Sequence, residues 1–211
     1  MQTLSHDAYL ALRATATVLE LDLHGEKVLQ LEDGNYLKLF RRKRLISSAA
    51  WYPYAQRFAD NAAELKERGI PCPEVIGVFR ISGFSRDAVR YLPLEGKTLR
   101  QVIQTDAAQH DLAEKLGRFV ARLHEAGVYF RSLHLGNIVL TPGGTLGLID
   151  IADLRTQGGA LDSNKRKRNL QRLSRDPPDC FWLSGEHKII FDNAYTAQQI
   201  AKTDKDRSHG M

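Results

Sequence analysis

The stretches FRSLHLGNIVL (130–140) and LGLIDIADL (146–154) decide the fold that we predict for this chain. Their apolar parts, IVLT and LGLIDI, are typical of short strands, and the PGG turn between them predicts a small hairpin. Asn137 comes just before the first strand, and Asp150 follows it by thirteen residues in the second. Polar residues at these two places either cap a turn and a strand end or bind a ligand.

The first third of the chain predicts a small sheet with one helix. From Thr17 to Phe40, apolar and polar residues alternate in three short runs, which the turn sequences HGEK and EDGN separate. This alternation predicts an antiparallel three-stranded meander. Phe58, Ala62 and Leu65 then recur at helical spacing, and GIPCP must end that helix.

Two more strands and a mainly helical half are predicted to follow. PEVIGVFRI (73–81) and FSRDAVRYLPL (84–94) are strand candidates, and Pro93 and Gly96 mark a connector. Residues 111–126 carry an apolar stripe at helical spacing, which predicts a long helix. NKRKRNLQRLSR predicts a final polar helix, and the last residues, TDKDRSHGM, predict a disordered tail.

Composition indicates a soluble globular protein in a reducing compartment. Apolar residues make up 43% and charged residues 26% of the 211, and the net charge of +5 gives a weak attraction to anionic partners. Cys72 and Cys180 lie far apart, which supports neither a disulfide framework nor a zinc site. The start has no apolar signal-peptide core, and no stretch is long enough to span a bilayer. We therefore expect a cytoplasmic protein, with peripheral contact at the inner membrane left open.

The order of these elements resembles the protein-kinase-like superfamily. Within it, residues 17–175 look most like the bacterial lipopolysaccharide kinases that phosphorylate heptose or 3-deoxy-D-manno-octulosonic acid (Kdo), including toluene-tolerance-type proteins. The resemblance implies an α+β fold of two lobes. The β-rich lobe would span residues 1–92, the mainly helical lobe residues 93–200, and a flexible tail residues 201–211.

The resemblance also implies ATP and Mg²⁺ as cofactors. Kinases of this superfamily hold Mg²⁺ with a catalytic-loop asparagine and a strand-end aspartate, which correspond here to Asn137 and Asp150. Both offer the oxygen ligands that hard cations prefer. The sequence Asp150-Ile-Ala-Asp153 replaces the glycine-bearing end of the D-F-G motif with a second carboxylate three residues on, and Asp153 either assists the metal or caps the next turn.

Lys38, in YLKLF, stands where the resemblance places the lysine that grips the α- and β-phosphates of ATP. A lysine in an apolar strand needs a partner or a ligand, unless its side chain lies on the solvent face. The family pattern pairs this lysine with a helix glutamate. That place falls near Asn61, so either Asn61 orients Lys38 by a hydrogen bond or Glu64, one turn later, forms the salt bridge.

The nucleotide-binding features are partly degenerate. The first turn, LDLHGEKV, offers Gly25 alone instead of G-x-G-x-x-G, which weakens backbone contact with phosphate. RYLPLEGKTL resembles the connector between kinase lobes. By that resemblance, backbone groups near Tyr91 and Leu92 would hydrogen-bond an adenine edge.

Ser132 is the main departure from the family pattern. The aspartate of H-R-D-L-x-x-x-N would fall on Ser132, and a serine hydroxyl is not basic at neutral pH. General-base assistance typically contributes about 10²- to 10⁴-fold, so its loss predicts a slow enzyme as readily as an inactive one. His134 is either a substitute base or part of the loop scaffold, and Arg131 would be structural.

Two basic clusters remain, Arg41–Arg44 and Lys165–Arg168 with Arg172. They are either solvated faces or contacts with acidic lipid or phosphorylated sugar. Nucleic-acid binding is disfavoured because no aromatic residues are interleaved with the charges. The leading hypothesis is an ATP-dependent kinase for a sugar or lipopolysaccharide core acceptor, and the alternative is a pseudokinase that binds nucleotide or a partner as a regulatory module.

Overall fold

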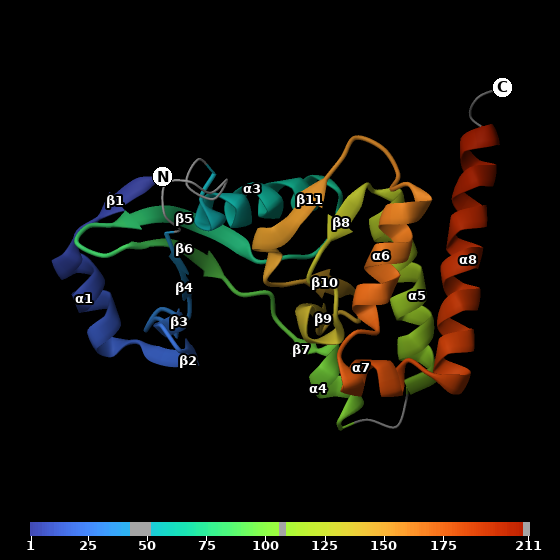
Figure 1. Cartoon of the computed structure of the whole chain (residues 1–211), viewed down its shortest axis with the longest axis horizontal. Coiled ribbons are helices and arrows are strands. Elements are labelled where there is room, and N and C mark those ends of the chain that lie inside the picture. The colour runs from blue at the N-terminus through green and yellow to red at the C-terminus, as the bar shows by residue number, and fades with distance from the viewer. Residues whose placement is uncertain (43–51, 106–108, 209–211) are drawn as a thin grey trace. The chain divides into compact units, whose positions relative to one another are not determined.

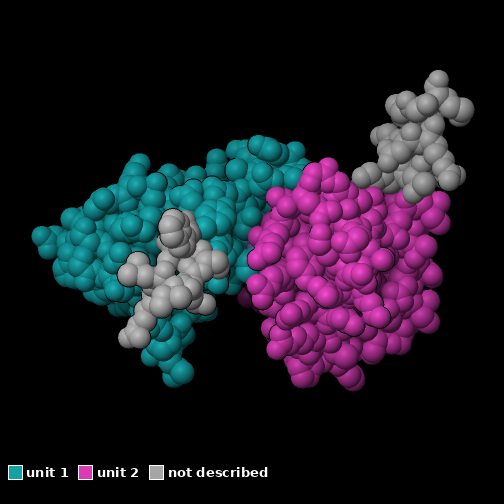
Figure 2. Space-filling view, turned by 45° about the horizontal axis from the view of Figure 1, so that its top comes forward, with its two compact units in different colours: residues 1–94, 150–153 teal, residues 95–149, 154–211 magenta. Residues whose placement is uncertain are grey.

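The computed structural model describes residues 1–42, 52–105 and 109–208, with side chains as far as residue 200. The chain forms two compact units, one of residues 1–94 and 150–153, the other of residues 95–149 and 154–211 (Figure 2). The predicted lobes were consecutive segments that met at residue 92. Instead, the chain returns to the first unit for the four residues Asp150–Asp153.

The first unit is built on a six-stranded sheet in the order β1-β5-β6-β4-β3-β2. All neighbouring strands pair antiparallel except β1, which is parallel to β5. The predicted meander, the helix after it and the next two strands are confirmed. The elements are β1 (Gln2–Leu4), α1 (His6–Thr15), β2 (Thr17–Asp22), β3 (Gly25–Gln30), β4 (Tyr36–Arg41), α3 (Tyr54–Glu67), β5 (Glu74–Ile81) and β6 (Arg86–Leu92).

The N-terminal pair β1 and α1 was not predicted from the sequence. Ser5 caps α1 by accepting a hydrogen bond from the backbone N–H of Ala8, at 3.1 Å. Tyr9 then packs into the sheet's core with Leu29, Leu37 and other buried residues. The Ser5 cap and the apolar residues after it were the available signals for this helix.

The second unit is mainly helical, with two small sheets. The predicted hairpin is confirmed as β9 and β10, and β7 pairs with the other edge of β9 while β8 pairs with β11. Its elements are β7 (Lys97–Thr98), α4 (Leu99–Ile103), α5 (Gln109–Glu125), β8 (Val128–Phe130), η1 (Leu135–Asn137), β9 (Ile138–Leu140), β10 (Leu146–Leu148), β11 (Leu154–Thr156), α6 (Ser163–Leu173), α7 (Pro177–Trp182) and α8 (Gly185–Ser208).

The last helix, α8, lies along α5 (Figure 1). Gly117 allows this close packing, because a Cβ there would lie 2.4 Å from the carbonyl oxygen of Phe191. The chain stays helical to Ser208, through most of the segment predicted as a flexible tail. Residues 201–208 contain neither glycine nor proline, so nothing in them interrupts the helix. Among the described residues, no helix combines the length and apolar character needed to cross a membrane.

A buried histidine connects α5 with α6 and α8. His124 is fully buried, and its Nδ1 lies 2.7 Å from the hydroxyl of Tyr195. Arg166 forms an ion pair with Glu125 beside it, at 2.7 Å. Burial, helped by the positive charge of Arg166, lowers the pKa of His124 to about 4.

Acidification is therefore expected to destabilise the fold through His124. Its pKa is lower in the folded than in the unfolded chain, so its contribution is intact above about pH 6.5 and is lost as the pH falls toward 4. Between about pH 7.5 and pH 5 the loss should be about 2 kcal/mol. Urea unfolding at both values should give this difference for wild type and a smaller one for His124→Gln. The matched exposed variant His24→Gln should keep the wild-type difference. The same free-energy difference between the two pH values in all three proteins would contradict the assignment.

Candidate active site

Lys38 lies in the middle of the first unit's sheet, where Val28 of β3 and Val89 of β6 flank it. The residue is only 7% exposed, so the solvent-face alternative for Lys38 is wrong. Its Nζ donates a hydrogen bond to Asp150 Oδ1 at 2.7 Å. The ammonium is thus neutralised by a carboxylate 112 residues away in the sequence.

Asp150 adopts an unusual backbone conformation. Its φ of 53° is the only positive value for a non-glycine residue in the described part of the chain. The left-handed region costs energy for most side chains, although aspartate tolerates it better than others, and such residues gather at functional sites. The side chain of Asp150 is 46% exposed, so the carboxylate that binds Lys38 also reaches solvent.

Neither predicted partner of Lys38 takes that role. Asn61, buried on α3, donates its side-chain N–H to the carbonyl of Ile151 at 2.7 Å. Glu64 forms an ion pair with Arg68 one turn later on the same helix. The prediction counted positions along α3 and missed Asp150, whose place depends on the fold. Asn61 instead holds the η2 turn (Ile151–Asp153) that follows Asp150.

Tyr91 and Leu92 end strand β6. Tyr91 is buried against Phe58 and Tyr36, with ring centroids 5.1 and 5.8 Å away. Burial, together with the negative charge of Asp150, raises the pKa of Tyr91, so its hydroxyl stays neutral. Leu92 is half exposed. Contact of their backbone with adenine stays a prediction, as does a metal or capping role for Asp153.

The turn around Gly25 is braced by an arginine. Arg86 of β6 donates hydrogen bonds to the carbonyl oxygens of His24 and Glu26. Phosphate is bound by backbone N–H groups, whereas these two carbonyls face a cation. This turn therefore differs from a glycine-rich phosphate loop in its bonding as well as in its glycine count.

In the second unit, Asn137 is buried at the end of η1, next to the β9 strand. Its amide nitrogen lies 3.0 Å from the carbonyl of Ser132 and 3.1 Å from Nε2 of His134. An amide nitrogen only donates, so both of its hydrogens are used, and Nε2 of His134 is the acceptor. This arrangement leaves Asn137 Oδ1 as the atom that can bind a cation.

A buried carboxylate that the sequence analysis missed supports this loop. Asp179 on α7 is fully buried, accepts the backbone N–H of Leu135 at 2.8 Å, and binds Arg100 through both oxygens at 2.9 and 2.8 Å. Asp176 binds the same guanidinium at 2.6 Å. The sequence DPPD was the available signal for this site. Proline is common at the first positions of a helix, so DPPD predicts a helix start with an acid on each side of the two prolines.

His134, Asp176 and Asp179 form a group whose ligand atoms lie within 4.8 Å of one another. Such a trio has the composition of a metal site. However, Arg100 already supplies the positive charge for both carboxylates, and hydrogen bonding to it lowers the pKa of Asp176. The group is therefore a support for the loop and differs from the predicted ligands Asn137, Asp150 and Asp153.

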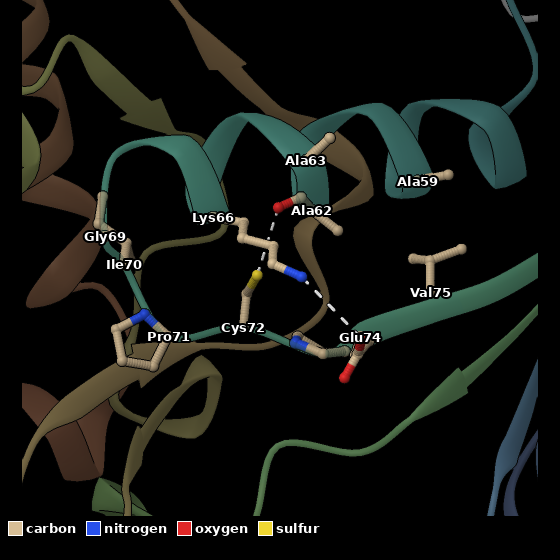
Figure 3. Close-up of a pocket in the computed structure, with 11 residues that line it drawn as sticks. Ala59, Ala62, Ala63, Lys66, Gly69, Ile70, Pro71, Cys72, Glu74 and Val75 are labelled. Carbon is tan, nitrogen blue, oxygen red and sulfur yellow. Dashed lines mark hydrogen bonds and ion pairs between the residues drawn. The ribbon is translucent and has the colours of Figure 1, made fainter.

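The first unit also contains a cavity of about 510 Å³ beside the second half of α3 (Figure 3). Mostly apolar residues line it, and Cys72 donates a hydrogen bond from its thiol to the carbonyl of Ala62 at 3.5 Å. Burial raises the pKa of Cys72 to about 11, so this thiol is unreactive at neutral pH. None of the predicted site residues lines this cavity.

Comparison with known proteins identifies a matching family. The model of the phosphotransferase enzyme family (APH) matches residues 25–132. The match includes Lys38 and ends at Ser132, so Asn137 and Asp150 lie beyond it.

Two curated relatives are named 3-deoxy-D-manno-octulosonic acid kinase. The protein from Vibrio vulnificus (strain YJ016) is 25% identical over 145 residues, which cover 64% of this chain and 60% of the relative. The protein from Xylella fastidiosa (strain M12) is 32% identical over 117 residues, 53% of this chain and 45% of the relative. The chain thus spans about half the length of these relatives, and their names agree with the resemblance stated from the sequence.

A solved structure has the same fold. The bifunctional kinase-methyltransferase WbdD matches with a TM-score of 0.50 at 14% identity, over 81% of this chain and 42% of that one. At this identity the likeness concerns the fold alone. The predicted α+β, protein-kinase-like fold is confirmed.

The support from Asp179 gives a testable difference between two neighbouring acids. Asp179→Asn should lower the free energy of unfolding by about 3 kcal/mol, because it weakens a buried ion pair. Asp176→Asn removes a contact of Arg100 that is partly exposed, and should cost about 1 kcal/mol or less. Urea unfolding measures both, and hydrogen exchange at Leu135 should accelerate only in the Asp179 variant. Equal effects of the two substitutions would rule out the proposed support.

Proposed function

Because the chain belongs to the phosphotransferase enzyme family, we propose that it is an ATP-dependent kinase that phosphorylates a hydroxyl group of a lipopolysaccharide core sugar. The acceptor class follows the names of the two relatives, which are kinases of a sugar acid. It would act in the cytoplasm, where ATP is available. The observation that carries the proposal is the ion pair between the buried ammonium of Lys38 and the half-exposed carboxylate of Asp150.

This ion pair joins two groups with separate tasks in a kinase. The Lys38 ammonium would bind the α- and β-phosphates, and the Asp150 carboxylate would bind the metal. In the absence of nucleotide, each neutralises the other, which avoids an unpaired buried cation. The pair therefore keeps both side chains in the positions from which Lys38 would bind a phosphate and Asp150 a metal ion. Tyr91 and Leu92, at the end of β6, are the proposed backbone contacts to adenine.

The residues present fit Mg²⁺. Asp150 offers a carboxylate that reaches solvent, and Asn137 offers an amide oxygen whose nitrogen is already bonded. These are the oxygen donors that Mg²⁺ prefers, and Asp153 is a third candidate. When bound, the ion would neutralise charge on the transferring phosphate.

The hydrogen bonds of the loop residues indicate which of them can take the proton of the acceptor hydroxyl. His134 accepts a hydrogen bond from Asn137 through Nε2, so we assign it to the loop scaffold and not to the role of general base. Ser132 then occupies the place of the family aspartate. Transfer would depend on positioning and charge neutralisation, and the acceptor hydroxyl would lose its proton to solvent water, because no carboxylate stands at position 132 to receive it. We therefore expect slow turnover.

Lys38→Met and Asp150→Asn should each weaken Mg·ATP binding by about tenfold or more, because each removes a charge that faces the phosphates or the metal. Asp150→Asn also leaves the Lys38 ammonium buried without its counter-charge, which should lower stability. The double variant Lys38→Met/Asp150→Asn removes that penalty and serves as the matched control. Calorimetry with Mg·ATP measures affinity, and wild-type affinity in the folded double variant would refute the site.

The second candidate function is a pseudokinase that binds nucleotide or a partner. Ser132 favours it, because no acid stands at the catalytic position of the loop. The two functions predict different responses when a carboxylate is restored. If this chain is a kinase, it lacks only the catalytic base. If it is a pseudokinase, it does not position the substrates for transfer.

Ser132→Asp is expected to raise phosphate transfer to a sugar acceptor by about tenfold, which corresponds to about 1.4 kcal/mol of barrier. Turnover of wild type, Ser132→Asp and Ser132→Asp/Asp150→Asn should be compared under identical Mg²⁺ and ATP. Activity that persists in the double variant would indicate a contaminating enzyme. An unchanged rate in Ser132→Asp would favour the regulatory function.

A further inference from the structure

The end of helix α6 runs beside the loop that contains Ser132. The side chain of Asn169 accepts a hydrogen bond from the backbone N–H of Phe130 at 3.4 Å. It also donates one to the backbone carbonyl of Phe130 at 2.6 Å. Seven residues later, a carboxylate oxygen of Asp176 lies within 4.8 Å of a ring nitrogen of His134. The hydrogen bonds of Asn169 and the short distance from Asp176 to His134 place residues 169–176 beside this loop.

Three arginines lie on these two segments. Arg131 comes directly after Phe130 on the loop and is exposed, Arg172 on α6 is half-buried, and Arg175 just after α6 is exposed. In the part of the chain that the structure describes, none of the three forms an ion pair with an acid. Their positive charges therefore lie on the loop of Ser132 and on the segment beside it, with no ion pair to neutralise them.

The acids of this region are bound to a different cation. Asp176 and Asp179 both bind Arg100. The hydrogen bond to Arg100 lowers the pKa of Asp176, and the positive charge of Arg175 adds to this effect. Unpaired like charges repel one another, and an anion that binds them relieves this repulsion. Arginine suits that task, because its planar guanidinium donates two parallel hydrogen bonds to a carboxylate or a phosphate.

We propose that Arg131, Arg172 and Arg175 bind the acid group of the acceptor sugar and so present its hydroxyl to the phosphate. The inference rests on the proposed kinase function, because Ser132 marks the place where the acceptor hydroxyl is expected. The relatives act, by name, on a sugar acid, whose carboxylate is the group that these arginines would recognise.

The basic run 165–168 does not share this arrangement. Lys165 donates to Gln157 at 2.6 Å, and Arg166 is paired with Glu125. Lys167 is exposed on the same helix as Arg172 but is rotated from it by about 140° around the helix axis. Lys167 is therefore a matched control, with the same charge on a different face.

The test compares the free sugar acid Kdo with its methyl ester, which lacks the charge. Initial rates with Mg·ATP give kcat and KM for each acceptor, and NMR titration without nucleotide gives the affinity for each sugar independently of turnover. Arg172→Gln should raise KM and Kd for the acid by about tenfold, since a hydrogen bond between charged groups is lost. Values for the ester and for Mg·ATP should not change.

Two further variants sharpen the result. Lys167→Gln should behave as wild type with both sugars. Arg172→Lys should keep part of the affinity for the acid, because the charge remains while the paired hydrogen bonds do not. Unchanged affinity of Arg172→Gln for the acid, or an equal loss for acid and ester, would overturn the proposal.

The failure of this inference is distinguishable from the failure of the kinase function. A wild type that binds no Mg·ATP refutes the kinase function, while the titration without nucleotide still decides whether the arginines bind the acid. Sedimentation with phosphatidylglycerol vesicles tests the other source of anionic groups. Loss of vesicle binding in Arg172→Gln, with unchanged affinity for the sugar acid, would make the arginines a membrane-contact surface and overturn the proposal.

Discussion

The buried ammonium of Lys38 is the constraint on which the site in the first unit depends. A cation in the middle of a sheet needs a counter-charge, and in this fold the counter-charge is Asp150. The chain therefore returns to the first unit at residue 150, where it adopts a left-handed backbone conformation. Asn61 then holds the following turn through the carbonyl of Ile151. The left-handed conformation of Asp150 and the buried side chain of Asn61 on α3 both help to position this one ion pair.

The same need to satisfy buried polar groups organises the loop of the second unit. Asp179 is fully buried, and it holds the loop through Leu135 while Arg100 neutralises its charge. Within the loop, the amide of Asn137 bonds Ser132 and His134, which directs its oxygen away from these contacts. Each unit thus holds one of the oxygen ligands that we propose for Mg²⁺, Asp150 in the first and Asn137 in the second. What the loop lacks is a carboxylate at Ser132, and slow chemistry is the consequence that we propose.

Local sequence patterns predicted most of the helices and strands, but they predicted fewer of the contacts between residues on different elements. The meander, the helix after it and the β9–β10 hairpin followed from alternation, helical spacing and turn residues, which are properties of neighbouring positions. Lys38 became a functional candidate because the resemblance places a phosphate-binding lysine there, and because a lysine inside an apolar strand needs a partner or a ligand. Its partner was wrong, since counting along one helix favoured Asn61 or Glu64. The α1 helix was missed although Ser5 provided a cap.

The sequence by itself determined the class of fold, because the order of helices and strands follows from periodicity and turn residues. The resemblance to lipopolysaccharide kinases named Lys38, Asn137 and Asp150 as candidate site residues. Only the tertiary structure decided that Lys38 is buried and paired with Asp150, because that contact joins residues 112 positions apart. It also decided that Arg100 and Asp179 support the loop and that Asn169 of α6 binds the backbone of Phe130. Contacts between distant segments depend on how helices and strands pack, which no local pattern specifies.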